Sequence, residues 1–248
     1  MKKSSGSTRT VVRPLYALLT PDGFVASNLP GWKNVTAIVN ISPVMGARFS
    51  QMHITFGENG TGEGNTGALE LFVFILEGRG TVKIAGKKTD LKAGGYVFIP
   101  PRINFHFSGD KETKLVVFQK KFEPLTGKKI SGIIVGHEKE IPSQPFLGNK
   151  DARLQVLLPD KMEFDLAVNI FTYQPGATLP FVETHVMEHG LLMLRGKGIY
   201  RLDEARHPVK AGDVIWMASF CPQWFIATGK TPASYIYYKD VNRAPLGE

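Results

Sequence analysis

Short runs of apolar residues, rich in Val, Ile, Phe and Tyr, alternate along the chain with Gly, Pro and Asn. Such runs are typical of β-strands, and many of them separated by turn residues indicate a β-sandwich or a β-barrel. Long segments with a 3.6-residue apolar period are nearly absent, so we expect few and short helices. The clearest predicted strands are residues 71–76, 80–84, 96–99, 115–118, 168–173 and 191–194.

These strands belong to two copies of one unit. Residues 71–80 (LFVFILEGRG) align with residues 189–198 (HGLLMLRGKG), and the same shift continues without a gap over about fifty residues. Each copy has a Gly-x-Gly, which is typical of a hairpin whose backbone needs positive φ. The repeat therefore predicts a duplicated β-barrel. The matched pairs include Gly78 with Gly196, Gly80 with Gly198, Gly94 with Gly212, Phe107 with Phe225, and Lys121 with Lys239.

The division between the copies falls in a segment rich in Pro and Gly, residues 124–148. We expect residues 14–145 to form a first barrel and residues 146–248 a second. Residues 1–13 precede the first predicted strand and are expected to be mobile.

The composition narrows the class of protein. No apolar run reaches the roughly 18–20 residues of a membrane span, and no apolar stretch follows Lys2 and Lys3. The single cysteine, Cys221, excludes an intrachain disulfide and fits a reducing compartment. We therefore expect a cytoplasmic protein, although a plant relative would be compatible with the endoplasmic reticulum.

The chain carries a net charge of +8, but its Lys and Arg residues are scattered among acidic ones. A nucleic-acid binder more often gathers basic residues on one face with aromatic residues between them. We expect no nucleic-acid partner, because a modest positive field suits a small anionic substrate better.

The second copy carries residues that suit a metal. Alternate residues of a strand share a face, so Glu183 and His185 can point together into the barrel. His189 opens the next strand, and Gln223 lies on a strand that returns toward the same cavity. Two imidazoles, one carboxylate and one amide suit Mn²⁺, Fe²⁺, Co²⁺, Ni²⁺ or Zn²⁺ and suit Ca²⁺ poorly.

The first copy has no equivalent set, because the aligned positions hold Asn65, Gly67, Leu71 and Phe105. An isolated Glu-x-His in a β-protein is usually a polar surface pair, and the repeat is what favours a metal site here. We expect the neighbouring Glu188 and Arg195 to face solvent.

The chain resembles the cupin superfamily of double-stranded β-helix (jelly-roll) barrels. Residues 93–101 (AGGYVFIPP) are similar to its second motif, and residues 211–217 (AGDVIWM) are similar to the beginning of that motif. The usual cupin set is His-x-His, Glu and His. The set here is Glu-x-His, His and Gln, which resembles the (S)-ureidoglycine aminohydrolase family of double cupins.

That resemblance implies a manganese enzyme of purine breakdown, a homo-oligomer that converts (S)-ureidoglycine and water into (S)-ureidoglycolate and ammonia. It implies that Glu183, His185, His189 and Gln223 hold Mn²⁺. It also implies that Tyr200, Tyr235 and Lys239 lie in the active site.

We expect Glu183 to act as a ligand and as a proton acceptor for water. Lys239 would bind the substrate carboxylate or pass a proton to ammonia, and Tyr200 and Tyr235 would hydrogen-bond the ureido group. Each has a plain structural alternative, since strand tyrosines usually pack a core and Lys239 aligns with Lys121 in the first copy.

Two other functions stay open. Two His and one carboxylate also describe a non-heme iron dioxygenase. A non-catalytic sugar-binding or storage double cupin is the second alternative, although such proteins usually lack the metal ligands in both barrels.

Overall fold

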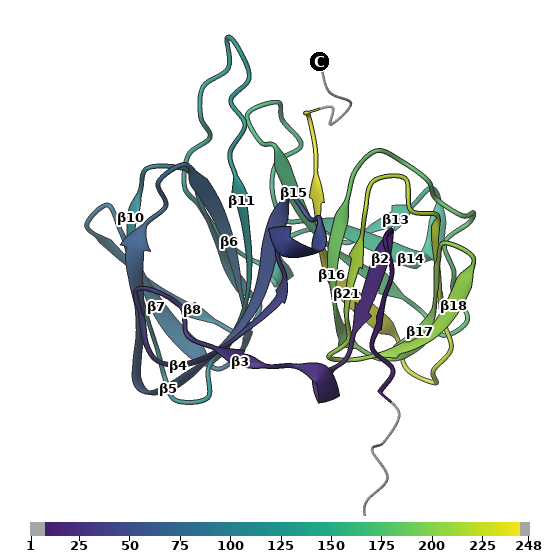
Figure 1. The fold of residues 1–248 in the computed structure, drawn as a ribbon. Coiled ribbons are helices and arrows are strands. Elements are labelled where there is room, and N and C mark those ends of the chain that lie inside the picture. The colour runs from purple at the N-terminus through teal and green to yellow at the C-terminus, as the bar shows by residue number, and fades with distance from the viewer. Residues whose placement is uncertain (1–7, 244–248) are drawn as a thin grey trace, which may run out of the picture.

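The computed structural model describes residues 8–243, which form two antiparallel β-barrels standing side by side (Figure 1). The first barrel, purple to teal in Figure 1, is a ten-stranded sheet. Its strands are β3 (Ala26–Ser27), β4 (Trp32–Ile41), β5 (Phe49–Asn65), β6 (Leu69–Glu77), β7 (Arg79–Ile84), β8 (Lys87–Lys92), β9 (Gly95–Ile99), β10 (Asn104–Gly109), β11 (Lys114–Lys121) and β12 (Ile134–His137).

The second barrel combines an eight-stranded and a three-stranded sheet. The larger sheet contains β1 (Val11–Val12), β2 (Tyr16–Leu19), β13 (Gln144–Phe146), β14 (Asn149–Val156), β15 (Leu166–Tyr173), β16 (His189–Arg195), β19 (Val214–Met217) and β21 (Ala233–Asp240). The smaller sheet contains β17 (Lys197–Leu202), β18 (Ala205–Lys210) and β20 (Gln223–Ala227).

The helical segments in the described part of the chain are three single turns of 3₁₀-helix, η1 (Pro21–Gly23), η2 (Pro43–Met45) and η3 (Glu138–Glu140). None of them is long and apolar enough to cross a membrane. The prediction of an all-β chain with two tandem barrels and few short helices is confirmed.

Three apolar cores stabilise this arrangement, one inside each barrel and one between them. Strand alternation divides the residues among the cores, because successive side chains point to opposite faces of a sheet. In β21, Tyr235 and Tyr237 belong to the core inside the second barrel, whereas Ile236 and Tyr238 belong to the core between the barrels. The two barrels thus bury a shared apolar face and pack as one body.

The hairpin glycines are required by the backbone. Gly78 and Gly196 have φ of +81° and +73°. A Cβ on Gly196 would lie 2.6 Å from the Cα of Ala233, and a Cβ on Gly78 would lie 2.9 Å from the Cα of Thr113. Only glycine combines this backbone with this close approach, which explains why both copies keep it.

The N-terminal strands belong to the second barrel. β2 pairs with β19, so a purple strand lies among the green ones in Figure 1. The sequence-based division placed residues 14–19 with the first barrel, and the structure differs because Ala17 and Leu18 are buried against the second barrel and the core between the barrels. Arg9 also anchors this end through two 2.7 Å bonds to the buried Asp213. The prediction that residues 1–13 are mobile includes residues 1–7, which lie outside the described residues.

The last strand departs from the gapless repeat. Leu71 aligns with His189 in sequence, and it pairs with Gln119, whereas His189 pairs with Lys239. The equivalent of Lys239 in the first barrel is therefore Gln119, and the alignment of Lys121 with Lys239 is wrong. The loop before β21 is longer than the loop before β11, which moves the register. A structural role shared by the two lysines is thereby excluded.

A buried charged cluster joins the barrels. Lys120 of β11 donates a 2.6 Å hydrogen bond to Asp165, just before β15, and a 2.9 Å bond to Glu123. Glu70 is fully buried beside them, and neither of its carboxylate oxygens has a hydrogen-bond partner. Burial, and then the Asp165 carboxyl, raise the pKa of Glu70 well above its usual range. Glu70 is therefore protonated at neutral pH.

We expect a Glu70→Gln variant to lose less stability than the wild-type chain as the pH rises from 5 to 9. The pKa of Glu70 is higher in the folded chain than in the unfolded chain. The stability that its protonated form contributes is therefore complete below the unfolded-state pKa and declines as the pH rises toward the folded-state pKa. The difference in free energy of unfolding should change by up to about 1.4 kcal/mol per pH unit. Urea melts at several pH values measure it, with the exposed Glu63→Gln as the control. Parallel curves for wild type and Glu70→Gln would contradict the assignment.

Candidate functional site

The second barrel encloses a cavity of about 210 Å³. Every residue that the sequence analysis proposed for the site lines it. The lining side chains are Phe146, Leu154, Phe171, Glu183, His185, Met187, His189, Leu191, Tyr200, Gln223, Tyr235, Tyr237 and Lys239.

Two imidazoles and an amide meet in this cavity. His189 Nε2 lies 3.2 Å from His185 Nε2, and Gln223 Nε2 lies 3.1 Å from the same atom. His185 Nδ1 lies 3.2 Å from the carbonyl oxygen of Met187, to which it donates as an N–H. That bond leaves the lone pair of His185 on Nε2, the atom that faces the cavity.

The protonation of the two histidines suits a metal. Burial lowers the pKa of His185 and lowers that of His189 further, with the charge of Lys239 acting in the same direction on both. Both rings are therefore neutral near pH 7, the form in which imidazole binds metals. Two neutral imidazoles whose Nε2 atoms lie 3.2 Å apart, with the Gln223 amide beside them, fit a divalent transition metal.

Glu183 reaches the cavity from a β-bridge with Gln223. Its backbone N–H donates to the carbonyl of Gln223 at 2.8 Å, and Gln223 N–H donates back at 2.9 Å. Within residues 8–243, however, no group of three His, Cys, Asp or Glu side chains is close enough to bind one metal ion. The two imidazoles lie close to each other, but the Glu183 carboxylate does not lie close to both of them. Burial raises the pKa of Glu183, and the Lys239 charge opposes that rise.

Tyr200 and Tyr235 line the cavity, and Tyr173 lies behind Tyr235. Tyr200 Oη donates to Gln223 Oε1 at 3.3 Å, which orients the amide. Tyr235 Oη lies 3.0 Å from Tyr173 Oη. Burial raises the pKa of all three hydroxyls. All three hydroxyls therefore stay neutral at physiological pH, and those of Tyr200 and Tyr235 can hydrogen-bond a ligand in the cavity.

Lys239 stands at the end of β21, where it pairs with His189 of β16. Tyr235, Tyr237 and Lys239 all line the cavity, because alternate residues of a strand share a face. Lys239 is the lysine among the lining residues, so it supplies the positive charge there.

Three further side chains support the site, and the sequence analysis gave none of them a role there. Tyr237 stacks on His189, with ring centroids 5.5 Å apart, and Asn169 donates to its hydroxyl at 3.1 Å. Tyr173 supports Tyr235 from β15. Tyr237 was detectable, since it shares the face of Tyr235 and Lys239. Asn169 and Tyr173 lie on a strand with no polar motif to mark them.

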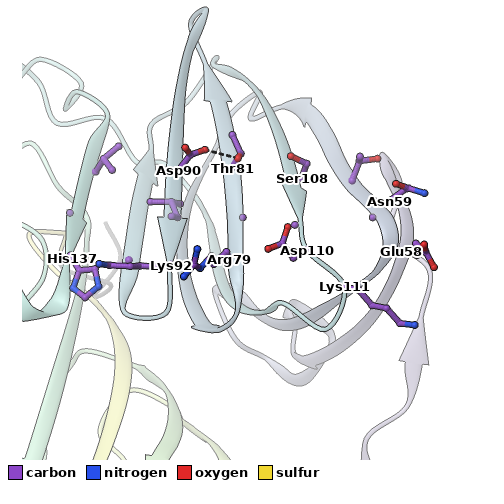
Figure 2. A pocket seen from close by; sticks show the side chains of 18 of the residues that line it. Glu58, Asn59, Arg79, Thr81, Asp90, Lys92, Ser108, Asp110, Lys111 and His137 are labelled. Carbon is purple, nitrogen blue, oxygen red and sulfur yellow. Dashed lines mark hydrogen bonds between the residues drawn. The ribbon is translucent and has the colours of Figure 1, made fainter.

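A larger hollow lies on the outer face of the first barrel (Figure 2). Its side chains, among them Arg79, Asp90, Lys92 and Asp110, are spread along the sheet with mixed charges, and Asp90 accepts a 2.8 Å hydrogen bond from Thr81. It is open and has no converging donor set. The interior of that barrel is apolar, with Leu71 at the position that aligns with His189.

Known proteins share both the sequence and the fold. The profile of the cupin domain matches residues 53–118 and 169–238. The chain is 39% identical over 246 residues to the (S)-ureidoglycine aminohydrolase of Arabidopsis thaliana, covering 97% of this chain and 80% of that protein. It is 34% identical over 233 residues to the (S)-ureidoglycine aminohydrolase of Escherichia coli K12, covering 92% of this chain and 89% of that protein.

Solved structures agree with these matches. The crystal structure of the Escherichia coli protein Ylba superposes with a TM-score of 0.85 at 33% identity, covering 96% of each chain. A Bacillus subtilis oxalate decarboxylase studied for its Mn(II) centres superposes with a TM-score of 0.71 at 9% identity, covering 94% of this chain and 78% of that one. The second likeness concerns the fold alone.

Proposed function

We propose a reaction from the premise that this chain belongs to the cupin superfamily and, within it, to the (S)-ureidoglycine aminohydrolase family. The protein hydrolyses (S)-ureidoglycine to (S)-ureidoglycolate and ammonia, a step of purine breakdown. The observation that carries the assignment to this cavity is the meeting of His185, His189 and Gln223 beside Lys239.

Four side chains would hold a divalent metal, Mn²⁺ by family resemblance: His185, His189, Gln223 and Glu183. When bound, the metal supplies Lewis acidity and favours an anionic ligand. Because the two imidazoles and the amide are neutral and only one donor is a carboxylate, a divalent metal held by these four side chains would keep a net positive charge. Other divalent transition metals suit the same donors.

The remaining residues orient the substrate. The Lys239 ammonium pairs with the substrate carboxylate, since it is the cation that lines the cavity. The neutral hydroxyl of Tyr235 donates a hydrogen bond to the ureido carbonyl, and the hydroxyl oxygen of Tyr200, whose O–H is held by Gln223, accepts one from a ureido N–H. Phe146, Leu154 and Phe171 provide an apolar wall that limits access of bulk water.

Proton transfers accompany the exchange of the amino group for a hydroxyl. A water oxygen bonds to the substrate carbon as the bond from that carbon to the amino nitrogen breaks. Glu183, whose pKa burial raises, accepts a proton from the water. The departing nitrogen takes up a proton and leaves as ammonia, and Lys239, the lysine that lines the cavity, is the proposed donor.

We also propose a homo-oligomer that acts on its small-molecule substrate in the cytoplasm. The family resemblance supports the assembly, and the lone, buried Cys221 is compatible with a reducing compartment. Burial raises the pKa of Cys221 to about 11, which makes it a poor nucleophile.

Incubation of the purified chain with (S)-ureidoglycine and Mn²⁺ should release ammonia without consuming oxygen. An oxygen electrode and an ammonia assay on the same sample separate hydrolysis from the dioxygenase alternative. Chelator should reduce ammonia release to the spontaneous rate. Oxygen uptake that depends on substrate would reject the proposal, and so would ammonia release that chelator leaves unchanged.

A further inference from the structure

One loop of the first barrel reaches the outer face of strands β16 and β21, which carry His189 and Lys239. Arg48 lies between η2 and β5, and its guanidinium donates to Glu188 Oε1 at 3.2 Å and to Asp240 Oδ2 at 2.7 Å. Its backbone N–H donates to Glu188 Oε1 at 2.9 Å. Both carboxylates are buried, so Arg48 neutralises charge that the second barrel encloses. The expectation that Glu188 faces solvent is therefore wrong.

Glu188 and Asp240 stand next to site residues in the chain. Glu188 precedes His189, and Asp240 follows Lys239. Glu188 N–H donates to Asp240 Oδ1 at 2.6 Å, which ties the start of β16 to the end of β21. Because strand neighbours point to opposite faces, the carboxylates turn outward toward Arg48 while His189 and Lys239 turn inward. One guanidinium thus holds both strand ends at the level of the site.

Neighbouring contacts reinforce this attachment. Phe49 stacks on Tyr238 with ring centroids 4.0 Å apart. Gly190 leaves room for that ring, since a Cβ there would lie 2.4 Å from Phe49. Trp216 Nε1 donates to the second oxygen of Glu188 at 3.3 Å. The outer faces of β16 and β21 are therefore packed against the first barrel on both sides of Arg48.

We propose that Arg48 of the first barrel is a positioning residue for the hydrolytic site of the second, fixing the strand ends that present His189 and Lys239. The inference rests on the proposed function for its catalytic consequence, although the positioning itself concerns the imidazoles and the lysine alone. It gives a part in the reaction to the first barrel, whose described residues hold no counterpart of the second barrel's proposed donor set.

The test compares Arg48→Gln and Arg48→Lys with Arg79→Gln, an exposed arginine on the same barrel whose side chain makes no ion pair within residues 8–243. Mn²⁺ titration should show about 10- to 100-fold weaker binding in Arg48→Gln, as for other changes to groups that orient metal ligands. Arg48→Lys should recover part of the lost Mn²⁺ affinity, because lysine keeps the positive charge but lacks the several planar N–H donors of the guanidinium. The value of kcat should fall more than KM rises.

A second readout needs neither metal nor substrate. The imidazole ¹H–¹³C resonances of His185 and His189 should shift in Arg48→Gln and stay unchanged in Arg79→Gln. A loss of thermal stability with unchanged imidazole resonances would overturn the inference and leave Arg48 a purely structural residue. If the wild-type chain fails to hydrolyse ureidoglycine while Arg48→Gln still shifts these resonances, the proposed function falls and the positioning role stands.

Discussion

A His185→Ala variant binds Mn²⁺ at least about 100-fold more weakly than the wild-type chain and releases ammonia only at the background rate. His185 Nε2 is the atom that both His189 and Gln223 face, so its loss removes the centre of the donor set. The lower bound follows because removing a group that merely orients a ligand already costs about 10- to 100-fold. Mn²⁺ titration and ammonia release measure the two effects.

The matched control for this variant is His106→Ala, which changes a half-buried histidine on β10 of the first barrel. It should bind Mn²⁺ and turn over substrate as the wild type does. Wild-type Mn²⁺ affinity in His185→Ala, with the fold intact by circular dichroism, would place the metal elsewhere.

A Lys239→Met variant loses about 100- to 1,000-fold in kcat/KM while it keeps its metal. The substitution removes the charge from the cavity and keeps an unbranched side chain of similar length. Loss of a preorganised charged or donor group in an active site has an effect of this size. Steady-state kinetics with (S)-ureidoglycine give the magnitude, and Mn²⁺ titration shows that the metal is retained.

Lys239→Arg separates two roles for the lysine. Arginine keeps the charge that pairs with a carboxylate, but its guanidinium does not give up a proton. If Lys239 only binds the substrate carboxylate, the variant should recover KM and much of kcat. If Lys239 also protonates the departing nitrogen, KM should recover and kcat should stay low. Wild-type kinetics in Lys239→Met would remove the residue from the mechanism, and Lys121→Met on the exposed end of β11 is the control.

The parts of the fold that could be predicted from the sequence are those fixed by local backbone requirements. Gly78 and Gly196 mark the same hairpin in both barrels because each needs positive φ beside a close neighbour. Strand alternation likewise placed Tyr235 and Lys239 on one face, and the cavity lining confirms this.

The contacts between the barrels could not be predicted, since they join residues far apart in the chain. Glu188 resembles a surface residue in sequence, and only the packing of Arg48 from the first barrel explains why its carboxylate is buried. The sequence repeat also could not show that Lys239 corresponds to Gln119 of the first barrel. The longer loop before β21 shifts this last strand relative to a repeat that otherwise aligns without gaps. Strand β2 joined the second barrel for a similar reason, since apolar strands of the same pattern fit either sheet.

Glu183 is the member of the proposed donor set whose carboxylate does not converge on the two histidines, since residues 8–243 contain no group of three such side chains. Glu183 and Gln223 are joined by a backbone bridge, which places both residues at the cavity. The orientation of the Glu183 carboxylate depends on its side-chain torsions and on the cation that it faces. A Glu183→Gln variant is therefore informative mainly in combination with metal titration.

The central claim is that the second barrel is a metal-dependent, stereospecific hydrolase of (S)-ureidoglycine, and the chirality of the product tests it most directly. Fresh (S)-ureidoglycine decays unaided, so ammonia alone is not sufficient. The Mn²⁺-loaded wild-type chain should form (S)-ureidoglycolate faster than the background, whereas the metal-free chain and His185→Ala should not. Racemic ureidoglycolate at the spontaneous rate from the Mn²⁺-loaded wild type would contradict the account.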